Sequence, residues 1–116
     1  MLGIVNGTTN YILDKMDSTG ASFNDALEEA QALGYAEADP TADVEGFDAA
    51  AKAAILAGLA FTAGSRPRTC TARASPRSPA TDVASAKAMG YVIKLLAHLR
   101  PLSTTAARSA CASTPR

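Results

Sequence analysis

The chain has 116 residues, no net formal charge and 47% hydrophobic residues, values typical of one small globular domain. No apolar run approaches the roughly 18 residues of a membrane span, and the start MLGIVNGTTN lacks the basic and long apolar regions of a signal peptide. We therefore expect a cytoplasmic protein of at most one domain, with no membrane contact.

The first part of the chain predicts a strand followed by two helices. Residues 2–5 are typical of the end of a buried strand, and Asn6-Gly7 is a turn signal. One of the two threonines that follow caps a helix to about residue 17. Ser22 caps a second helix, with an acid three residues later as in a capping box, and Gly34 ends it.

The stretch after that glycine predicts a third helix, capped by Asp39 and ending near Phe61. At about 100° per residue, Asp48 and Lys52 fall on the same face as Leu56 and Leu59. Asp43 and a row of alanines fall on the opposite face. This pattern predicts that the charged pair points inward with the large apolar side chains.

Two interpretations of the Asp48 and Lys52 pair stay open. Their spacing of four residues is that of an ordinary exposed ion pair on a helix. Their position beside a leucine stripe favours a functional role, because burying two charges is seldom the best route to stability. A lysine placed in this way is a candidate proton donor or base.

Two further segments are candidate ligand-binding sites. The loop 34–40 carries Tyr35 and Glu37 just before the third helix, where binding groups often lie, although a plain polar linker explains it too. The turn in residues 3–10 could bind an anion or carbonyl through backbone N–H groups at a helix start. No histidine or cysteine spacing suits a metal, so we expect no metal site, and the two cysteines do not define a disulfide.

The rest of the chain predicts a short helix over 81–90 and a strand over 91–97, which is rich in β-branched residues. Helices followed by strand material favour an α+β fold, with one layer of helices on a sheet.

Three blocks of this sequence resemble homoserine dehydrogenase. They are GIVNGTTNYIL (3–13), EEAQALGYAEADPTADVEGFDAAAKAAILA (28–57) and DVASAKAMGYVIKLLA (82–97). The order and spacing of the first two blocks make the resemblance specific, and it covers most of 2–61 and 81–97. It implies an NAD(P)-dependent oxidoreductase that interconverts L-homoserine and L-aspartate 4-semialdehyde, on the route from aspartate to threonine, isoleucine and methionine.

The resemblance also implies roles for single residues. Lys52 matches the acid–base residue at the substrate oxygen, and Asp48 matches the acid that helps to bind substrate and hold that lysine. Glu37 matches the residue that binds the substrate amino group, with Tyr35 beside it. Gly7 and Thr8 match the turn that lies against substrate and nicotinamide.

The family's cofactor, NADP or NAD, is bound mainly by a nucleotide-binding domain that has no counterpart in these 116 residues. The resemblance therefore implies a fragment, the front part of the catalytic and dimerisation domain, inactive alone. The intact enzyme is expected to be a homo-oligomer. A second hypothesis is a small helical module whose basic tail binds nucleic acid or an acidic partner. Because that tail has no aromatic residue for base stacking and no lysine, we expect no nucleic-acid partner.

Composition divides the chain into four segments. All seven arginines, both cysteines and five of the six prolines lie in 62–80 and 98–116, which contain no Asp, Glu, Lys, Val or Ile. We interpret 1–61 and 81–97 as parts of the catalytic domain, and the other two segments as aberrant and disordered. We predict that both are translated in a shifted reading frame, in which codons for 69–79 can also encode the strand-forming run VHREGITEVT. Neither segment should then pack against the helices.

Overall fold

A computed structural model describes residues 1–61, 69–71, 80–100 and 110–115. In these ranges the elements are, in order, β1 (Leu2–Gly3), α1 (Gly7–Thr19), α2 (Phe23–Ala32), α3 (Thr41–Val44), α4 (Phe47–Ala60), β2 (Thr69–Thr71), α5 (Ala80–Ala88), β3 (Leu95–Arg100) and β4 (Ala110–Pro115). The described strands form one sheet with helices against it, which confirms the predicted α+β fold.

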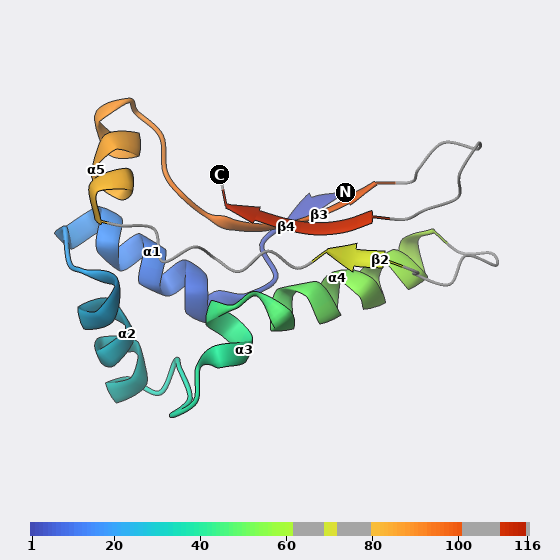
Figure 1. Cartoon of the computed structure of the whole chain (residues 1–116), viewed down its shortest axis with the longest axis horizontal. Coiled ribbons are helices and arrows are strands. Elements are labelled where there is room, and N and C mark those ends of the chain that lie inside the picture. The colour runs from blue at the N-terminus through green and yellow to red at the C-terminus, as the bar shows by residue number, and fades with distance from the viewer. Residues whose placement is uncertain (62–68, 72–79, 101–109, 116) are drawn as a thin grey trace.

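The sheet has the strand order β1-β3-β4-β2. Strand β3 runs antiparallel to both of its neighbours, and β2 runs parallel to β4. Helices α1 and α4 lie beneath the sheet in Figure 1, with α2 and α3 farther from it. Along β3, Leu95, Ala97 and Leu99 are buried and His98 is exposed, as expected when alternate residues face the helices.

The main core joins the first two helices. Ile12, Leu13 and Met16 of α1 form a buried stripe at helical spacing, and Phe23 and Ala26 of α2 pack in the same cluster. Each large apolar side chain buried here stabilises the fold by about 1.5–3 kcal/mol. This core holds α1 rigidly, and the N-terminal end of α1 leads into the candidate site.

Helix α1 begins earlier in the chain than predicted, because its N-cap lies in the predicted turn and is not one of the two threonines that follow. Asn6 is the N-cap, and its side-chain oxygen accepts a hydrogen bond of 2.8 Å from the Thr9 amide. The predicted cap of α2 is confirmed, since Ser22 accepts a 3.2 Å bond from the Asp25 amide. Gly34 follows α2 with φ of +79°, the left-handed conformation that ends helices.

The single helix predicted over 39–61 is wrong. It is two helices, because Gly46 lies between α3 and α4 with φ of +80° and breaks the helical path. Angular positions calculated for one continuous helix therefore do not hold for Asp43, which belongs to α3. This break brings Asp43 back to the side of Asp48 and Lys52.

The predicted burial of α4 is also wrong. Its buried side chains are Ala49, Ala53 and Ala57, whereas Leu59 is 72% exposed. The small alanine row allows α4 to approach the sheet closely, and Ala53 and Ala57 pack with Leu99 of β3. The charged pair thus points away from the sheet into an open hollow.

Two expectations for the second half of the chain need correction. Strand β3 covers Leu95–Arg100, so only the last three residues of the strand predicted over 91–97 are in a strand. The expectation that neither 62–80 nor 98–116 packs against helices is wrong for β2, β4 and the end of β3. Strands β2 and β4 pair in the sheet and lie against α4, and Leu99 of β3 packs with the alanines of α4. Strand pairing uses backbone groups, which every residue carries. The rest of 62–80 and 98–116 is mostly outside the described residues.

Candidate functional site

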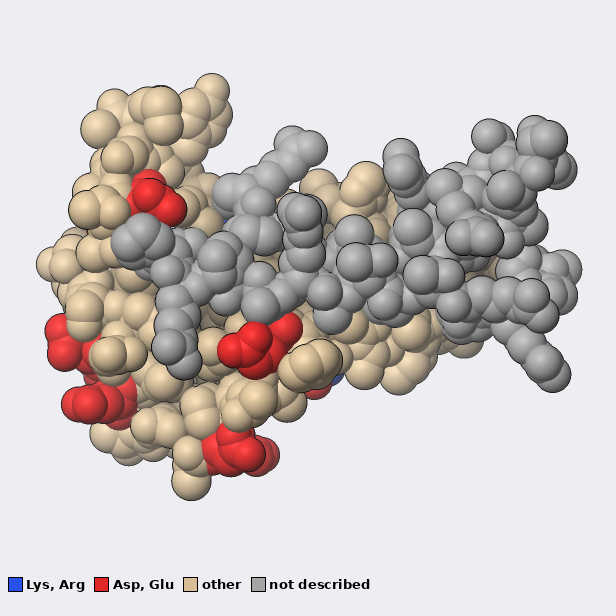
Figure 2. All heavy atoms as spheres, viewed as in Figure 1, with Lys and Arg blue, Asp and Glu red and all other residues tan. Residues whose placement is uncertain are grey.

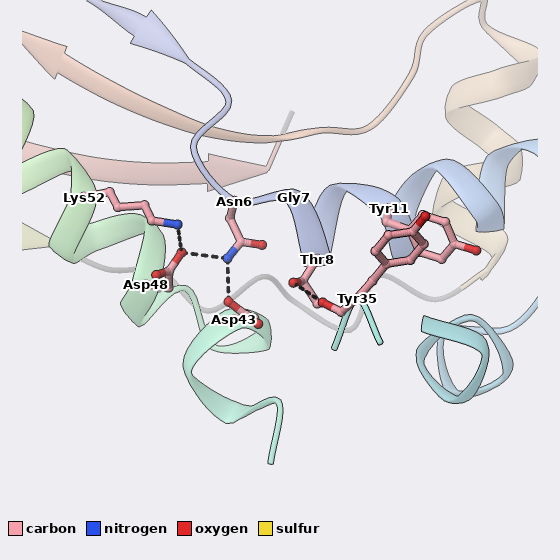
Figure 3. Close-up of a pocket in the computed structure, with 8 residues that line it drawn as sticks. All are labelled: Asn6, Gly7, Thr8, Tyr11, Tyr35, Asp43, Asp48 and Lys52. Atoms are coloured by element: carbon pink, nitrogen blue, oxygen red, sulfur yellow. Dashed lines mark hydrogen bonds and ion pairs between the residues drawn. The ribbon is translucent and has the colours of Figure 1, made fainter. Parts of the chain in front are cut away.

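A polar cavity of about 410 Å³ lies where the start of α1 meets α3 and α4. Figure 3 shows the side chains that line it, and they come from three regions of the chain: Asn6, Gly7, Thr8, Tyr11, Tyr35, Asp43, Asp48 and Lys52. This volume is in the range of small-molecule sites.

Asn6 connects the two carboxylates of the cavity. Its side-chain nitrogen donates to Asp43 Oδ1 at 2.7 Å and to Asp48 Oδ2 at 2.9 Å. Asn6 is only 2% exposed. In Figure 3 the amide stands between the two acids, at the point where α1 begins.

Lys52 is the cation of the cavity. Its ammonium lies 2.8 Å from Asp48 Oδ2, and its side chain is 50% exposed. The hydrogen bond from Lys52, and after it the bond from Asn6, hold the pKa of Asp48 below its usual value, against the opposing effect of desolvation. Asp48 is therefore a carboxylate at neutral pH, and it fixes the lysine that faces the open cavity.

Backbone contacts tie the loops to this arrangement. The Thr9 hydroxyl donates to the backbone oxygen of Asp43 at 2.9 Å, which fastens α3 to α1. The Thr8 hydroxyl donates to the backbone oxygen of Tyr35 at 2.8 Å, which fastens the loop after α2. These two adjacent threonines therefore anchor both of the segments that approach α1.

Two aromatic rings close one end of the cavity. The rings of Tyr11 and Tyr35 have centroids 4.9 Å apart. The Tyr11 hydroxyl donates to Glu29 Oε1 at 3.2 Å, and Lys15 donates to the same oxygen at 2.7 Å. The Lys15 hydrogen bond is the largest cause that lowers the pKa of Glu29. The Lys15–Glu29 ion pair therefore orients Tyr11 through its hydroxyl group.

The structure brings together five of the six predicted site residues: Gly7, Thr8, Tyr35, Asp48 and Lys52. Glu37 does not line the cavity, and its side chain is exposed in the loop after α2. Its backbone oxygen accepts a 3.0 Å bond from the Gln31 side chain. Glu37 lies only two residues beyond Tyr35.

Sequence reasoning missed Asn6, Asp43 and Tyr11. Asn6 was assigned only to a turn, although an asparagine before a helix start is itself a signal for an N-cap. Asp43 was placed on the far face because the break at Gly46 was not recognised.

A second hollow, of about 350 Å³, also has Lys52 in its lining. It is lined by Val5, Lys52, Ile55 and Leu56. Lys52 is therefore shared by a cavity lined with polar residues and a hollow lined mainly by apolar ones. Such a pair of compartments suits a polar substrate that meets an apolar ring beside a proton donor.

Acidic side chains lie on the described helical part of the face shown in Figure 2. Acidic surfaces repel polyanions, so the described helices give no support to a nucleic-acid partner. In the same part of the chain there is no group of three metal-ligating side chains, and no helix is long and apolar enough to cross a membrane.

Comparisons with known proteins agree on one family. The family model described as homoserine dehydrogenase matches residues 1–115. The homoserine dehydrogenase of Mycobacterium tuberculosis is 58% identical over 106 residues, which are 88% of this chain and 23% of that protein. The crystal structure of a homoserine dehydrogenase from Thiobacillus denitrificans is similar, with a TM-score of 0.82 and 43% identity over 98% of this chain and 26% of that one.

A hyperthermophilic archaeal homoserine dehydrogenase in complex with NADPH is also similar, with a TM-score of 0.72 and 29% identity, over 99% of this chain and 30% of that one. The chain therefore spans about a quarter of the length of the relatives that it matches.

Proposed function

The chain belongs to the homoserine dehydrogenase family, and we propose that it forms the substrate pocket of an enzyme that interconverts L-homoserine and L-aspartate 4-semialdehyde. In this proposal 1–61 and 81–97 are parts of the catalytic domain. The hydride passes to or from NAD or NADP, and a relative in complex with NADPH supports a nicotinamide cofactor. The resemblance further implies a cytoplasmic homo-oligomer in the synthesis of threonine, methionine and isoleucine.

The observation that carries the proposal is the Lys52 ammonium, held by Asp48 at the wall of a polar cavity. Reduction of an aldehyde puts negative charge on its oxygen as hydride reaches the carbon. An ammonium beside that oxygen stabilises the charge and donates the proton that makes the hydroxyl. In the oxidation direction the neutral amine accepts the hydroxyl proton.

The amino-acid end of the substrate needs partners of both signs. The N-terminal end of α1, at Gly7 and Thr8, presents backbone N–H groups and the positive end of the helix dipole, which suit the substrate carboxylate. The carboxylates at positions 37 and 48 suit the substrate ammonium. Because the Thr8 bond anchors Tyr35, the loop that carries Glu37 starts at the cavity.

The apolar hollow beside Lys52 would hold the nicotinamide ring. Val5, Ile55 and Leu56 offer it a surface without competing polar groups. When bound, the ring supplies or accepts the hydride. On this placement, Lys52 contacts both compartments and lies near the carbon–oxygen bond that reacts.

The test is an enzyme in which residues 1–61 of this chain replace the matching segment of the Mycobacterium tuberculosis homoserine dehydrogenase, called the 1–61 chimera below. Its NAD(P)H formation should depend on L-homoserine. Lys52→Ala should lower kcat by about 10²–10⁴-fold, the usual effect of losing a general acid. A segment that abolishes turnover on transfer would contradict the proposal.

The matched control is Lys94→Ala in the isolated chain. Lys94 also pairs with an aspartate, Asp14, at 3.0 Å, but it lies outside the cavity. Compared with Lys52→Ala in the same isolated chain, it shows what the loss of one lysine–aspartate pair does to stability, apart from any effect on proton transfer. Thermal unfolding should show similar, small effects of the two substitutions.

A further inference from the structure

We propose that Asn6 is a positioning residue that holds the carboxylates of Asp43 and Asp48 side by side and so sets the orientation of Lys52. The inference deepens the proposed function, since the importance of Lys52 rests on it. Asn6 lines the cavity with a neutral amide, which carries no charge to the reacting atoms. It acts through its neighbours.

The amide of Asn6 has its hydrogen-bonding capacity committed. Its oxygen accepts a hydrogen bond from the Thr9 amide at 2.8 Å. This bond determines which way the oxygen and the nitrogen of the side-chain amide point. Its nitrogen has two hydrogens, and the two partners are Asp43 and Asp48. At 2% exposure, the side chain has little freedom to turn or to exchange these partners for water.

This arrangement solves an electrostatic problem. Asp43 and Asp48 come from different helices, and both place an oxygen within hydrogen-bond distance of one nitrogen. Two carboxylates so close repel each other, and the repulsion disfavours the charged forms. A neutral double donor between them offsets it without adding a charge.

Asp48 transmits this constraint to the lysine. The same oxygen, Oδ2, accepts from both Asn6 and Lys52. A half-exposed lysine side chain has many rotamers, and holding it in one costs conformational entropy. Because the hydrogen bond from Asn6 holds the Asp48 carboxylate in place, the Lys52 ammonium keeps the same partner and stays at the cavity wall.

The titratable groups facing Asp48 define what removal of Asn6 would do. Hydrogen bonds from Lys52 and Asn6 lower the pKa of Asp48 and desolvation raises it, while Asp43 on α3 and the two tyrosines line the same cavity. Without Asn6, Asp48 loses a hydrogen bond that stabilises its charged form. Asp48 should then titrate at higher pH and hold Lys52 less firmly.

The first test uses the 116-residue chain with Asn6→Ser. Serine is as good an N-cap as asparagine, so α1 keeps its start, but the short side chain cannot donate to both acids. Carboxyl ¹³C NMR should show the pKa of Asp48 raised in this variant. Ser22→Ala is the control, because it removes the N-cap of α2 away from the cavity and should leave the Asp48 titration unchanged. An identical Asp48 titration in wild type and Asn6→Ser would overturn the proposal.

The second test measures catalysis in the 1–61 chimera with Asn6→Ser, which keeps a capping oxygen and adds no charge but cannot donate to both acids. We expect kcat to fall at least tenfold and the acid limb of the pH profile to move to higher pH. A merely structural defect lowers the amount of active enzyme without moving the profile, and that result would refute the inference. A parent chimera with no turnover would count against the proposed function instead, while the Asp48 titration would still decide the role of Asn6.

Discussion

Replacing Asn10 by alanine should destabilise the fold far more than the loss of one surface amide. Asn10 is 8% exposed, and its amide joins α1 to β3. Its nitrogen donates to the Leu95 backbone oxygen at 3.1 Å, and its oxygen accepts from the Leu95 amide at 2.8 Å. The same nitrogen donates to the Asn6 backbone oxygen at 2.8 Å.

The side chain takes the place of a missing strand residue. At Leu99, β3 exchanges both backbone bonds with Met1, and Leu95, four residues earlier, points its backbone groups to the same edge. The chain has already turned from β1 into α1 at this point. Asn10 therefore satisfies the strand edge where β1 has ended.

The magnitude follows from the two backbone groups of Leu95, which is 1% exposed. A buried group left without its partner costs about 1–3 kcal/mol, so Asn10→Ala should lower the free energy of unfolding by about 2–4 kcal/mol. Urea unfolding followed by circular dichroism measures this, with an unchanged m-value if only stability changes. The control is Asn24→Ala on the exposed start of α2, expected to cost less than about 0.5 kcal/mol. Equal effects of the two variants would refute the reasoning.

Four other outcomes are expected. Glu37→Ala in the 1–61 chimera should mainly raise KM if this residue binds the unreactive end of the substrate, as we propose; a fall in kcat at unchanged KM would contradict that role. The 116 residues alone should form no NAD(P)H from L-homoserine, since hydride transfer needs an oriented dinucleotide, and turnover above a Lys52→Ala control would show otherwise. The hydrogen bond from Lys15 lowers the pKa of Glu29 in the folded state. The stability that this bond contributes is therefore present above the ordinary glutamate pKa and is lost as the pH falls through the folded-state pKa. The difference in unfolding free energy between wild type and Glu29→Gln should shrink on acidification, and a constant difference would disprove this linkage. Sequencing the encoding DNA should show acidic and aliphatic codons in the shifted frame of 62–80 and 98–116; their absence would end the reading-frame hypothesis.

The sequence predicted much of the fold because several of its signals are local. The cap at Ser22 and the stop at Gly34 act within a few residues, and both are where they were expected. The break at Gly46 was not predicted, since an isolated glycine inside a helical pattern is compatible with helix. Only its left-handed conformation shows that α3 and α4 are separate.

The burial of α4 shows a limit of apolar periodicity. The pattern assigned the core to the face with Leu56 and Leu59, because larger side chains bury more surface. The sheet instead packs against the alanine row, because these short side chains let the backbone of α4 lie close to the strands. Which face wins depends on the shape of the partner surface, and that is a property of the tertiary fold.

The site was partly predictable for a similar reason. Lys52 and Asp48 are one helical turn apart, so their pairing could be read from spacing. The contacts of Asn6 with Asp43 and Asp48 join residues 37 and 42 positions apart. No local pattern encodes such contacts, and they become visible only in the folded chain.

Chemical rescue of Lys52→Ala in the 1–61 chimera tests the central claim most directly. If the Lys52 ammonium exchanges the proton with the substrate oxygen, added methylammonium should restore turnover in proportion to its concentration. Tetramethylammonium, which carries the charge but no exchangeable proton, should not. A variant that neither cation rescues, or that both rescue equally, would contradict the assignment of Lys52 as the proton donor.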